Sequence, residues 1–201
     1  GDTLGMSVRS EEQLRRSLYA VAAKTPRDTL TNFIDGLTWD AVPRLNHWLQ
    51  RYAGAPDTEA TALIGMTLCC AMVARALAPG GIQRYMVILE GEEDIGKSGL
   101  VHALGAPWSR TLSKGMDTKD AQMLLHGCWV MEVPELDSYR RTEESAIKAF
   151  LTTTADTFIP KYANTPRTYQ RRTVFVGTVN PQGSYLKGQT GNTRFLPVRC
   201  S

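Results

Sequence analysis

Apolar residues in the first eighty positions recur with the spacing of helix faces. One such face consists of Leu45, Trp48, Leu49 and Tyr52, at spacings i, i+3, i+4 and i+7. A capping box that starts at Ser10 begins an earlier helix. These signals predict four helical stretches, over residues 10–23, 30–37, 45–52 and 58–78. We therefore predict an N-terminal helical bundle over residues 1–80, and we expect it to be an oligomerisation region.

The pattern changes after Gly81. Short apolar runs of strand type now alternate with helical stretches, over residues 85–90, 99–104, 121–125, 128–133, 143–151, 173–178 and 193–198. Such alternation is typical of an α/β fold with a mostly parallel sheet. Residues 81–201 are therefore predicted to form an α/β core that follows the helical bundle.

The run from Gly91 to Ser98 has the pattern G-x-x-x-x-G-K-S of a phosphate-binding P-loop. A strand pattern precedes it and a helical pattern follows it, which is the context that this motif requires. Lys97 would reach the β- and γ-phosphates of ATP, and the Ser98 hydroxyl would be a ligand of Mg²⁺. The predicted nucleotide-binding residues are Gly91, Glu92, Glu93, Asp94, Ile95, Gly96, Lys97, Ser98 and Gly99.

The acidic residues of this loop oppose the binding of a nucleotide. The carboxylates of Glu92, Glu93 and Asp94 would repel a triphosphate unless they point to solvent or are screened. In such loops the backbone holds the phosphates, and most of the variable side chains face outward. The alternative is a glycine turn that joins a strand to a helix without binding a nucleotide.

A second strand pattern supplies the acidic group that an ATP hydrolase needs. The apolar run from Cys128 to Met131 ends at Glu132, and Glu135 follows after Val133-Pro134. We assign Glu132 to the metal ion or its bound water and Glu135 to the general base, and the two roles can be exchanged. The alternative is an ordinary strand whose terminal glutamates face solvent.

Two further polar residues complete the predicted catalytic set. Asn180 ends the strand pattern of residues 173–179 and is expected to orient the attacking water; its alternative is an Asn-Pro turn. Arg194 follows a glycine-rich segment and suits an arginine finger, acting in a neighbouring subunit of a ring; its alternative is a surface arginine at a strand start. The predicted catalytic residues are Lys97, Glu132, Glu135, Asn180 and Arg194, and the predicted metal ligands are Ser98 and Glu132.

Residues 158–172 combine basic and aromatic side chains on both sides of a turn pattern, Ala-Asn-Thr-Pro. We predict a hairpin that follows a DNA backbone through its basic side chains and stacks on bases through its tyrosines. In the alternative the hairpin is only solvated, and its last two arginines pair with the nucleotide or a neighbouring subunit. The predicted DNA-binding residues are Lys161, Tyr162, Arg167, Arg171 and Arg172, with Lys161 favoured.

Composition limits the class of protein but does not give a function. The net charge of +3 over 201 residues is only mildly basic, so it does not by itself indicate nucleic acid. The four cysteines, Cys69, Cys70, Cys128 and Cys200, lack metal-ligand spacing, and we interpret them as small buried residues of a reducing compartment. The three histidines show no ligand spacing either, and we interpret them as structural. We find no signal peptide and no apolar run long enough to cross a membrane, so we expect no membrane partner. Because the chain does not begin with Met, we expect it to be part of a longer protein.

These motifs, in this order, resemble the virulence-associated protein E family of phage, prophage and genomic-island proteins, which is similar to superfamily 3 helicases of the AAA+ class. The resemblance extends over residues 30–200 and rests on segments 36–45, 89–98, 118–120, 129–136, 147–152, 174–180 and 190–198. It implies a P-loop ATPase core that belongs to a replicative DNA helicase or primase-helicase. Such proteins form hexameric rings around DNA and hydrolyse ATP at subunit interfaces. They bind DNA through a hairpin that here contains Lys161. It also implies the cytoplasm of a bacterium or of a phage-infected host cell.

Two residues depart from the family pattern. Asp94 stands where a glycine is usual, which puts the nucleotide affinity in question, and Gly99 stands where a second hydroxyl is usual. Two other functions therefore stay open. One is a non-catalytic DNA-binding or scaffold module with a relic P-loop, which assembly without ATP hydrolysis would support. The other is a P-loop phosphotransferase, which DNA-stimulated turnover would exclude.

Overall fold

The computed structural model describes residues 10–24, 28–112, 118–136, 144–160, 164–180 and 194–201. The chain divides into two compact units, Gly1–Leu37 and Thr38–Ser201. The first unit contains α1 (Glu11–Lys24) and α2 (Thr29–Asp35). The N-cap of α1 is the predicted one, because Ser10 Oγ accepts a hydrogen bond from the backbone N–H of Gln13 at 3.2 Å. The described side chains of α1 are almost all exposed, so this helix buries little apolar surface.

The second unit is built on a parallel sheet. Among the described residues, five strands form it in the order β2-β3-β6-β1-β7, and each neighbouring pair is parallel. Their bounds are β1 Met86–Glu90, β2 Ser109–Thr111, β3 Val130–Val133, β6 Val174–Val179 and β7 Phe195–Arg199. Every residue of β3 and β6 is buried, as expected for central strands covered on both faces. The predicted α/β class with a mostly parallel sheet is confirmed, and the carboxyl ends of the strands meet at one edge.

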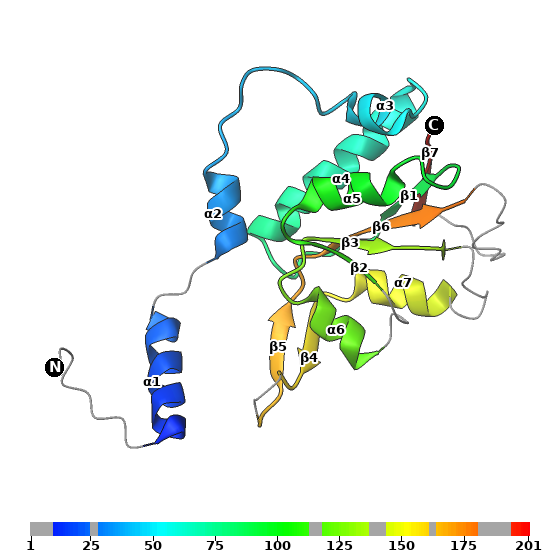
Figure 1. Cartoon of the computed structure of the whole chain (residues 1–201). Helices are drawn as coiled ribbons and strands as arrows, with labels where there is room; N and C mark the ends of the chain where they lie inside the picture. The colour runs from blue at the N-terminus through cyan, green and yellow to red at the C-terminus, as the bar shows by residue number, and fades with distance from the viewer. Residues whose placement is uncertain (1–9, 25–27, 113–117, 137–143, 161–163, 181–193) are drawn as a thin grey trace. The chain divides into compact units, whose positions relative to one another are not determined.

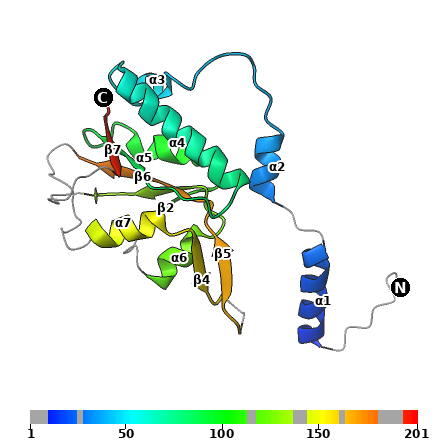
Figure 2. The same ribbon diagram turned by 180° about the vertical axis from the view of Figure 1, so that it is seen from behind.

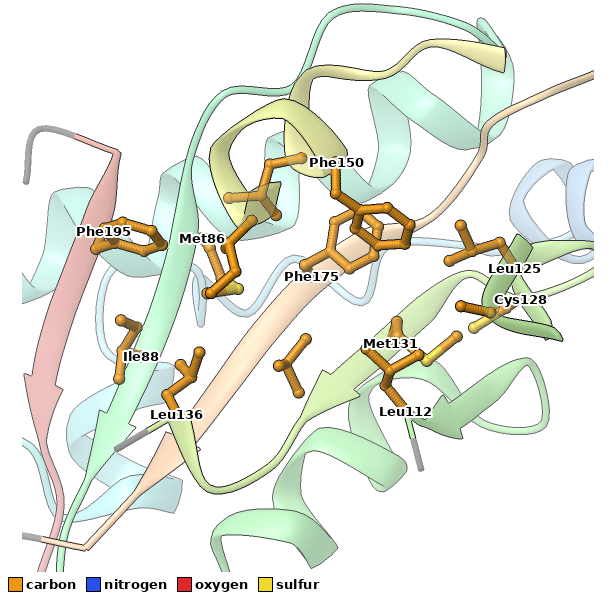
Figure 3. Close-up of a cluster of buried hydrophobic side chains, with 14 of the residues drawn as sticks. Met86, Ile88, Leu112, Leu125, Cys128, Met131, Leu136, Phe150, Phe175 and Phe195 are labelled. Carbon is orange, nitrogen blue, oxygen red and sulfur yellow. The ribbon is translucent and has the colours of Figure 1, made fainter. Parts of the chain in front are cut away.

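Helices cover both faces of this sheet. They are α3 (Trp48–Ala53), α4 (Glu59–Leu77), α5 (Lys97–Gly105), α6 (Lys119–Leu125) and α7 (Glu144–Thr152). Helices α4 and α5 lie on one side, and α6 and α7 lie on the other (Figures 1 and 2). On the α7 side the ring of Phe150 packs on that of Phe175, with centroids 5.3 Å apart (Figure 3). Leu136, just after β3, is fully buried in the same cluster. This core holds the strand ends in fixed positions.

Helices α3 and α4 belong to the same compact unit as the sheet. The indole N–H of Trp129 donates to the carbonyl oxygen of Met72 in α4 at 2.8 Å. The guanidinium of buried Arg75, also in α4, donates to the carbonyl oxygen of Thr173 at 2.7 Å. The compact units therefore divide at residue 37, not at the predicted boundary of residue 80. The physical reason is that one face of α4 packs against β6 and β1 and not against a separate bundle.

Helix α4 also corrects the expectation that no apolar run is long enough to cross a membrane. Within the described part of the chain, it is one helix that is long and apolar enough by length and composition. Core helices of soluble proteins meet the same criterion. Met72 and Arg75 of α4 bond to Trp129 and Thr173 of the sheet unit.

Two further elements differ from, or add to, the predicted pattern. A hairpin is present as predicted, but its first strand lies earlier than expected: β4 (Ala155–Phe158) pairs antiparallel with β5 (Arg167–Gln170), and the hairpin extends beside α6 (Figures 1 and 2). Strand β2 was not predicted, because Ser109-Arg110-Thr111 has no apolar run.

The four cysteines are free, but they are not equally buried. Burial raises the pKa of the Cys128 thiol to about 12, and it raises the pKa of Cys69 and Cys200 to about 11. Cys70 is exposed on α4. The prediction that all four are buried therefore holds only for Cys128: Cys69 and Cys200 are half-buried, and Cys70 lies on a side of α4 that the sheet does not cover.

Candidate active site

The loop of residues 91–96 joins β1 to α5 at the carboxyl edge of the sheet. Gly96 is the N-cap of α5 with a φ of 90°, a left-handed conformation that favours glycine. A Cβ on Gly91 would lie 2.4 Å from Ile95 Cδ1 and 2.8 Å from the carbonyl oxygen of Cys200, so no side chain fits there. Both motif glycines are thus required by the backbone. The first turn of α5, which starts at Lys97, leaves N–H groups without intrahelical acceptors next to the loop.

The ammonium of Lys97 connects the loop to a neighbouring strand. Its Nζ donates to the carbonyl oxygens of Gly91 at 2.6 Å and Glu92 at 2.5 Å, and to Asn180 Oδ1 at 3.3 Å. Asn180 directly follows β6, which lies beside β1 in the sheet. The structure therefore brings together two of the predicted catalytic residues, which are far apart in the sequence.

The predicted metal ligands also meet. Ser98 Oγ donates to Glu132 Oε1 at 2.6 Å, and Thr178 Oγ1 donates to the same oxygen at 3.0 Å. Thr111 Oγ1 donates to Glu132 Oε2 at 2.9 Å. The Glu132 residue is only 2% exposed. A buried carboxylate without partners would be strongly destabilising, and these three hydroxyl groups supply the hydrogen bonds that an ionised carboxylate requires.

A pocket of about 350 Å³ is lined by Ser98 and Thr178, two of the residues whose hydroxyls bond buried Glu132. Glu135 lies at its edge with an exposed side chain and a φ of 50°, and Asp94 lines it with a φ of 62°. Non-glycine residues in this left-handed region are strained, and such strain concentrates at functional sites. The residues that line the pocket are Glu93, Asp94, Gly96, Lys97, Ser98, Gly99, Pro134, Glu135, Thr178, Val179 and Asn180.

The charges around the pocket have both signs. Glu92, Glu93 and Asp94 are exposed, as predicted for the variable positions of the loop, but Glu93 and Asp94 also line the pocket. Their carboxylates oppose an anionic ligand, and the Lys97 ammonium favours it. A divalent cation bound with a triphosphate would offset the charge of these carboxylates.

The donors present fit magnesium held together with a nucleotide. Among the described residues, no group of three or more His, Cys, Asp and Glu side chains could hold a metal ion by itself. Ser98 and Glu132 supply one hydroxyl and one carboxylate. Magnesium sites in nucleotide-binding proteins typically use one or two carboxylates, phosphate oxygens and water. The pair therefore suits a shared site and not an all-protein metal cage.

Arg194 lies on the other edge of the sheet. Its carbonyl oxygen accepts from the backbone N–H of Met86, the first residue of β1, whereas the loop follows the last residue of β1. Five strand residues span about 16 Å. The guanidinium donates instead to the carbonyl oxygen of Lys148 in α7 at 2.9 Å. Arg194 is therefore separated from the pocket of its own chain.

The predicted DNA-binding residues have different environments. Arg167 is exposed on β5, whereas Arg171 is only 4% exposed. The Arg171 guanidinium donates to both carboxylate oxygens of Asp156, at 2.5 and 2.6 Å, and lies over the ring of Phe150. The prediction that Arg171 contacts DNA is therefore wrong, because the ion pair with Asp156 holds its guanidinium in the protein interior. Arg172 is partly buried, and Lys161 and Tyr162 lie outside the described residues.

Three residues near Glu132 were not identified from the sequence. Thr178 could have been found, because it precedes Asn180 by two positions and shares its side of β6. Thr111 and His102 lie on β2 and α5. No local motif singles them out, since their proximity to Glu132 depends on the order of strands in the sheet.

Comparisons with known proteins agree with this fold. No curated protein sequence matches the chain. Two solved structures of the C-terminal region of NrS-1, described as the A form in the apo state, are similar with TM-scores of 0.54 and 0.53 at 14% identity. The match covers 81% of this chain but only 39% and 38% of those chains, so the likeness shows the fold alone. The sequence profile of the virulence-associated protein E-like domain matches residues 34–201. The chain therefore belongs to the virulence-associated protein E-like domain family.

Proposed function

We propose that this chain is the ATP-hydrolysing module of a DNA helicase or translocase, within a replication protein of a phage or another mobile element. One observation carries the proposal: Ser98 Oγ and Glu132 Oε1 lie 2.6 Å apart at the start of α5 and on β3. A hydroxyl from a glycine loop and an acid from a neighbouring strand are the protein ligands that P-loop hydrolases use for Mg²⁺.

The other pocket residues support the roles that the sequence predicts. The N–H groups at the start of α5 would hold the phosphates, and Lys97 would exchange its loop acceptors for phosphate oxygens. Mg²⁺, when bound, neutralises charge that develops on the transferred phosphate. Glu135 is exposed to the pocket and suits the general base better than buried Glu132 does. Asn180 would orient the attacking water from the end of β6.

The position of Arg194 supports action between subunits. Arg84, Arg172 and Arg194 precede three adjacent strands, β1, β6 and β7, so they lie on the amino edge of the sheet. Glu93 and Asp94 lie on the carboxyl edge. The family resemblance implies a hexameric, head-to-tail ring. Such a ring would set the basic amino edge of one copy against the acidic carboxyl edge of the next. Arg194 would then reach the nucleotide of its neighbour.

The hairpin is the proposed DNA contact. Exposed Arg167 lies on β5 and Lys161 lies between β4 and β5 in the sequence. The base of the hairpin packs on the chain through Tyr169, whose ring stacks on Phe158 at 4.9 Å and lies 4.3 Å from the ring of His126. This packing would hold the basic residues at a fixed position for a phosphate backbone.

The test is ATP hydrolysis with Mg²⁺, with and without single-stranded DNA, for the natural chain and for Lys97→Ala. Exposed Lys119→Ala on α6 serves as the matched control. Because Lys97 also bonds the loop backbone, thermal unfolding of each variant must accompany the assay. We expect turnover that DNA stimulates and that only Lys97→Ala loses. An assembled protein without turnover would instead support the scaffold function, which the acidic loop favours.

A further inference from the structure

The two oxygens of the Glu132 carboxylate have different surroundings. Oε1 accepts from Ser98 on α5 and from Thr178 on β6, beside the pocket. Oε2 accepts from Thr111 Oγ1 at 2.9 Å and lies 3.5 Å from His102 Nε2. One oxygen therefore faces the proposed metal, and the other is held from the β2 side of the sheet.

The hydrogen atoms around Oε2 can be assigned by counting. Thr111 has one hydroxyl hydrogen and two neighbours at 2.9 Å, Glu132 Oε2 and His102 Nε2. An ionised carboxylate only accepts, so the Thr111 hydrogen goes to Glu132. In the tautomer of His102 that carries its hydrogen on Nε2, the imidazole donates to Thr111 Oγ1. The result is a chain of donors from His102 through Thr111 to Glu132.

Backbone geometry dictates these contacts. Thr111 is the register partner of Glu132 in the parallel pair of β2 and β3, so the two side chains lie side by side. His102 follows Ser98 by four residues on α5, so both project from one side of the helix towards Glu132. Ser109 lies beside the imidazole: its hydroxyl donates to the carbonyl oxygen of His102 at 3.0 Å, and its Oγ lies 3.3 Å from Nδ1.

We propose that Thr111 and His102 are positioning residues, which keep Glu132 Oε1 turned towards Ser98 and the metal. This inference rests on the proposed function. The terminal torsion of a glutamate is broad, so hydrogen bonds to one oxygen decide where the other points. Loss of such outer partners typically weakens metal binding by about 10- to 100-fold. Neither residue touches the nucleotide phosphates in this scheme.

Two pairs of variants test the proposal. Thr111→Val removes the hydroxyl at constant shape, and Thr111→Ser keeps it. His102→Leu removes the Nε2 donor, and His102→Gln keeps an amide donor near the same position. Mn²⁺ is the probe, followed by electron paramagnetic resonance in the presence of ADP, with metal-free ADP affinity and thermal unfolding measured beside it.

We expect Thr111→Val and His102→Leu to weaken Mn²⁺ binding by about 10- to 100-fold, with ADP affinity in the absence of metal unchanged. Thr111→Ser and His102→Gln should stay close to the natural chain. Natural Mn²⁺ affinity in Thr111→Val and His102→Leu would overturn the positioning role, as would an equal loss in all four variants. If the natural chain itself binds ADP but no Mn²⁺, the proposed function fails together with the inference.

Discussion

Ser98 Oγ donates a hydrogen bond to Glu132 Oε1 at 2.6 Å, although 34 residues separate the two in the sequence. The contact exists because β3 and α5 pack together, with β6 placed between β1 and β3 in the sheet. It joins the first hydroxyl after the glycine loop to a fully buried acid. In the proposed function, the same contact would make both residues available to one Mg²⁺ ion.

Replacing Glu132 by glutamine should separate binding from hydrolysis. The amide keeps the volume and one acceptor oxygen for the surrounding hydroxyls, but it removes the charge that a Mg²⁺ ligand needs. We expect ATP to bind with nearly natural affinity and single-turnover hydrolysis to fall by about 100-fold or more. Exposed Glu59→Gln is the control. Hydrolysis within twofold of the natural rate would contradict the assignment of Glu132.

Asp94 combines strain and charge, and two substitutions separate them. With a φ of 62° it occupies a left-handed conformation that glycine adopts freely and asparagine tolerates. Asp94→Asn removes only the charge, whereas Asp94→Gly also removes the strain. We expect both to tighten ATP binding, and only Asp94→Gly to stabilise the fold, by about 1 kcal/mol.

Calorimetry and thermal unfolding check these effects of Asp94. If neither variant binds ATP more tightly, the carboxylate does not face the phosphates. The acidic loop then gives no reason to doubt nucleotide binding.

Arg171 and Arg167 should behave in opposite ways. Arg171→Ala leaves the buried Asp156 carboxylate without its bidentate partner, which should destabilise the fold by about 3–5 kcal/mol. Arg171→Lys should fail to restore stability, because an ammonium cannot form the planar pair or stack on Phe150.

Arg167→Ala should leave stability within about 0.5 kcal/mol and weaken binding of single-stranded DNA, reducing the salt dependence by about one charge. Urea unfolding and fluorescence anisotropy measure the two effects of each arginine variant. Unchanged DNA affinity in folded Arg167→Ala would count against the hairpin as the DNA contact.

The thiols should differ sharply in their reactivity. The thiolate is the reactive form, and burial holds the pKa of Cys128 at about 12, so Cys128 stays protonated and covered at pH 8. Exposed Cys70 should react first with a thiol reagent such as DTNB, and Cys70→Ser should remove that fast phase. Because the folded state keeps the Cys128 proton above the ordinary pKa of 9.0, stability should fall as pH rises from about 9 towards 12. A fast phase that persists in Cys70→Ser would contradict this order.

Sequence patterns within a few residues correctly predicted the features that depend only on neighbouring residues. The glycine loop, the capping of α1 and the strand that ends near Glu132 follow from turn chemistry and apolar periodicity, and each is present. Pairings that depend on the order of strands were beyond such patterns. Thr111 reaches Glu132 only because the short polar strand β2 joins the sheet beside β3.

The sequence also did not show which of two similar side chains is buried. Arg171 and Arg172 are adjacent and chemically alike, yet Arg171 is buried because Asp156 lies opposite it across the base of the hairpin. The predicted domain boundary at residue 80 was wrong for a related reason. An apolar helix has the same sequence pattern whether it packs on other helices or on a sheet. The buried face of α4 is the one that packs against β6 and β1.

Arg194 provides the test of assembly. It lies at the amino end of β7, across the sheet from the pocket, so it cannot complete the site of its own chain. If Arg194 is an arginine finger, Arg194→Ala should lower the rate of ATP hydrolysis by about 10³-fold while ATP binding persists. Mixing Arg194→Ala with Glu135→Gln should restore part of the activity, because some interfaces then combine an intact Glu135 with an intact Arg194. Exposed Arg51→Ala, on α3 and away from that edge, is the matched control. A lack of rescue at every mixing ratio, in mixtures that sizing shows to be assembled, would exclude action between subunits.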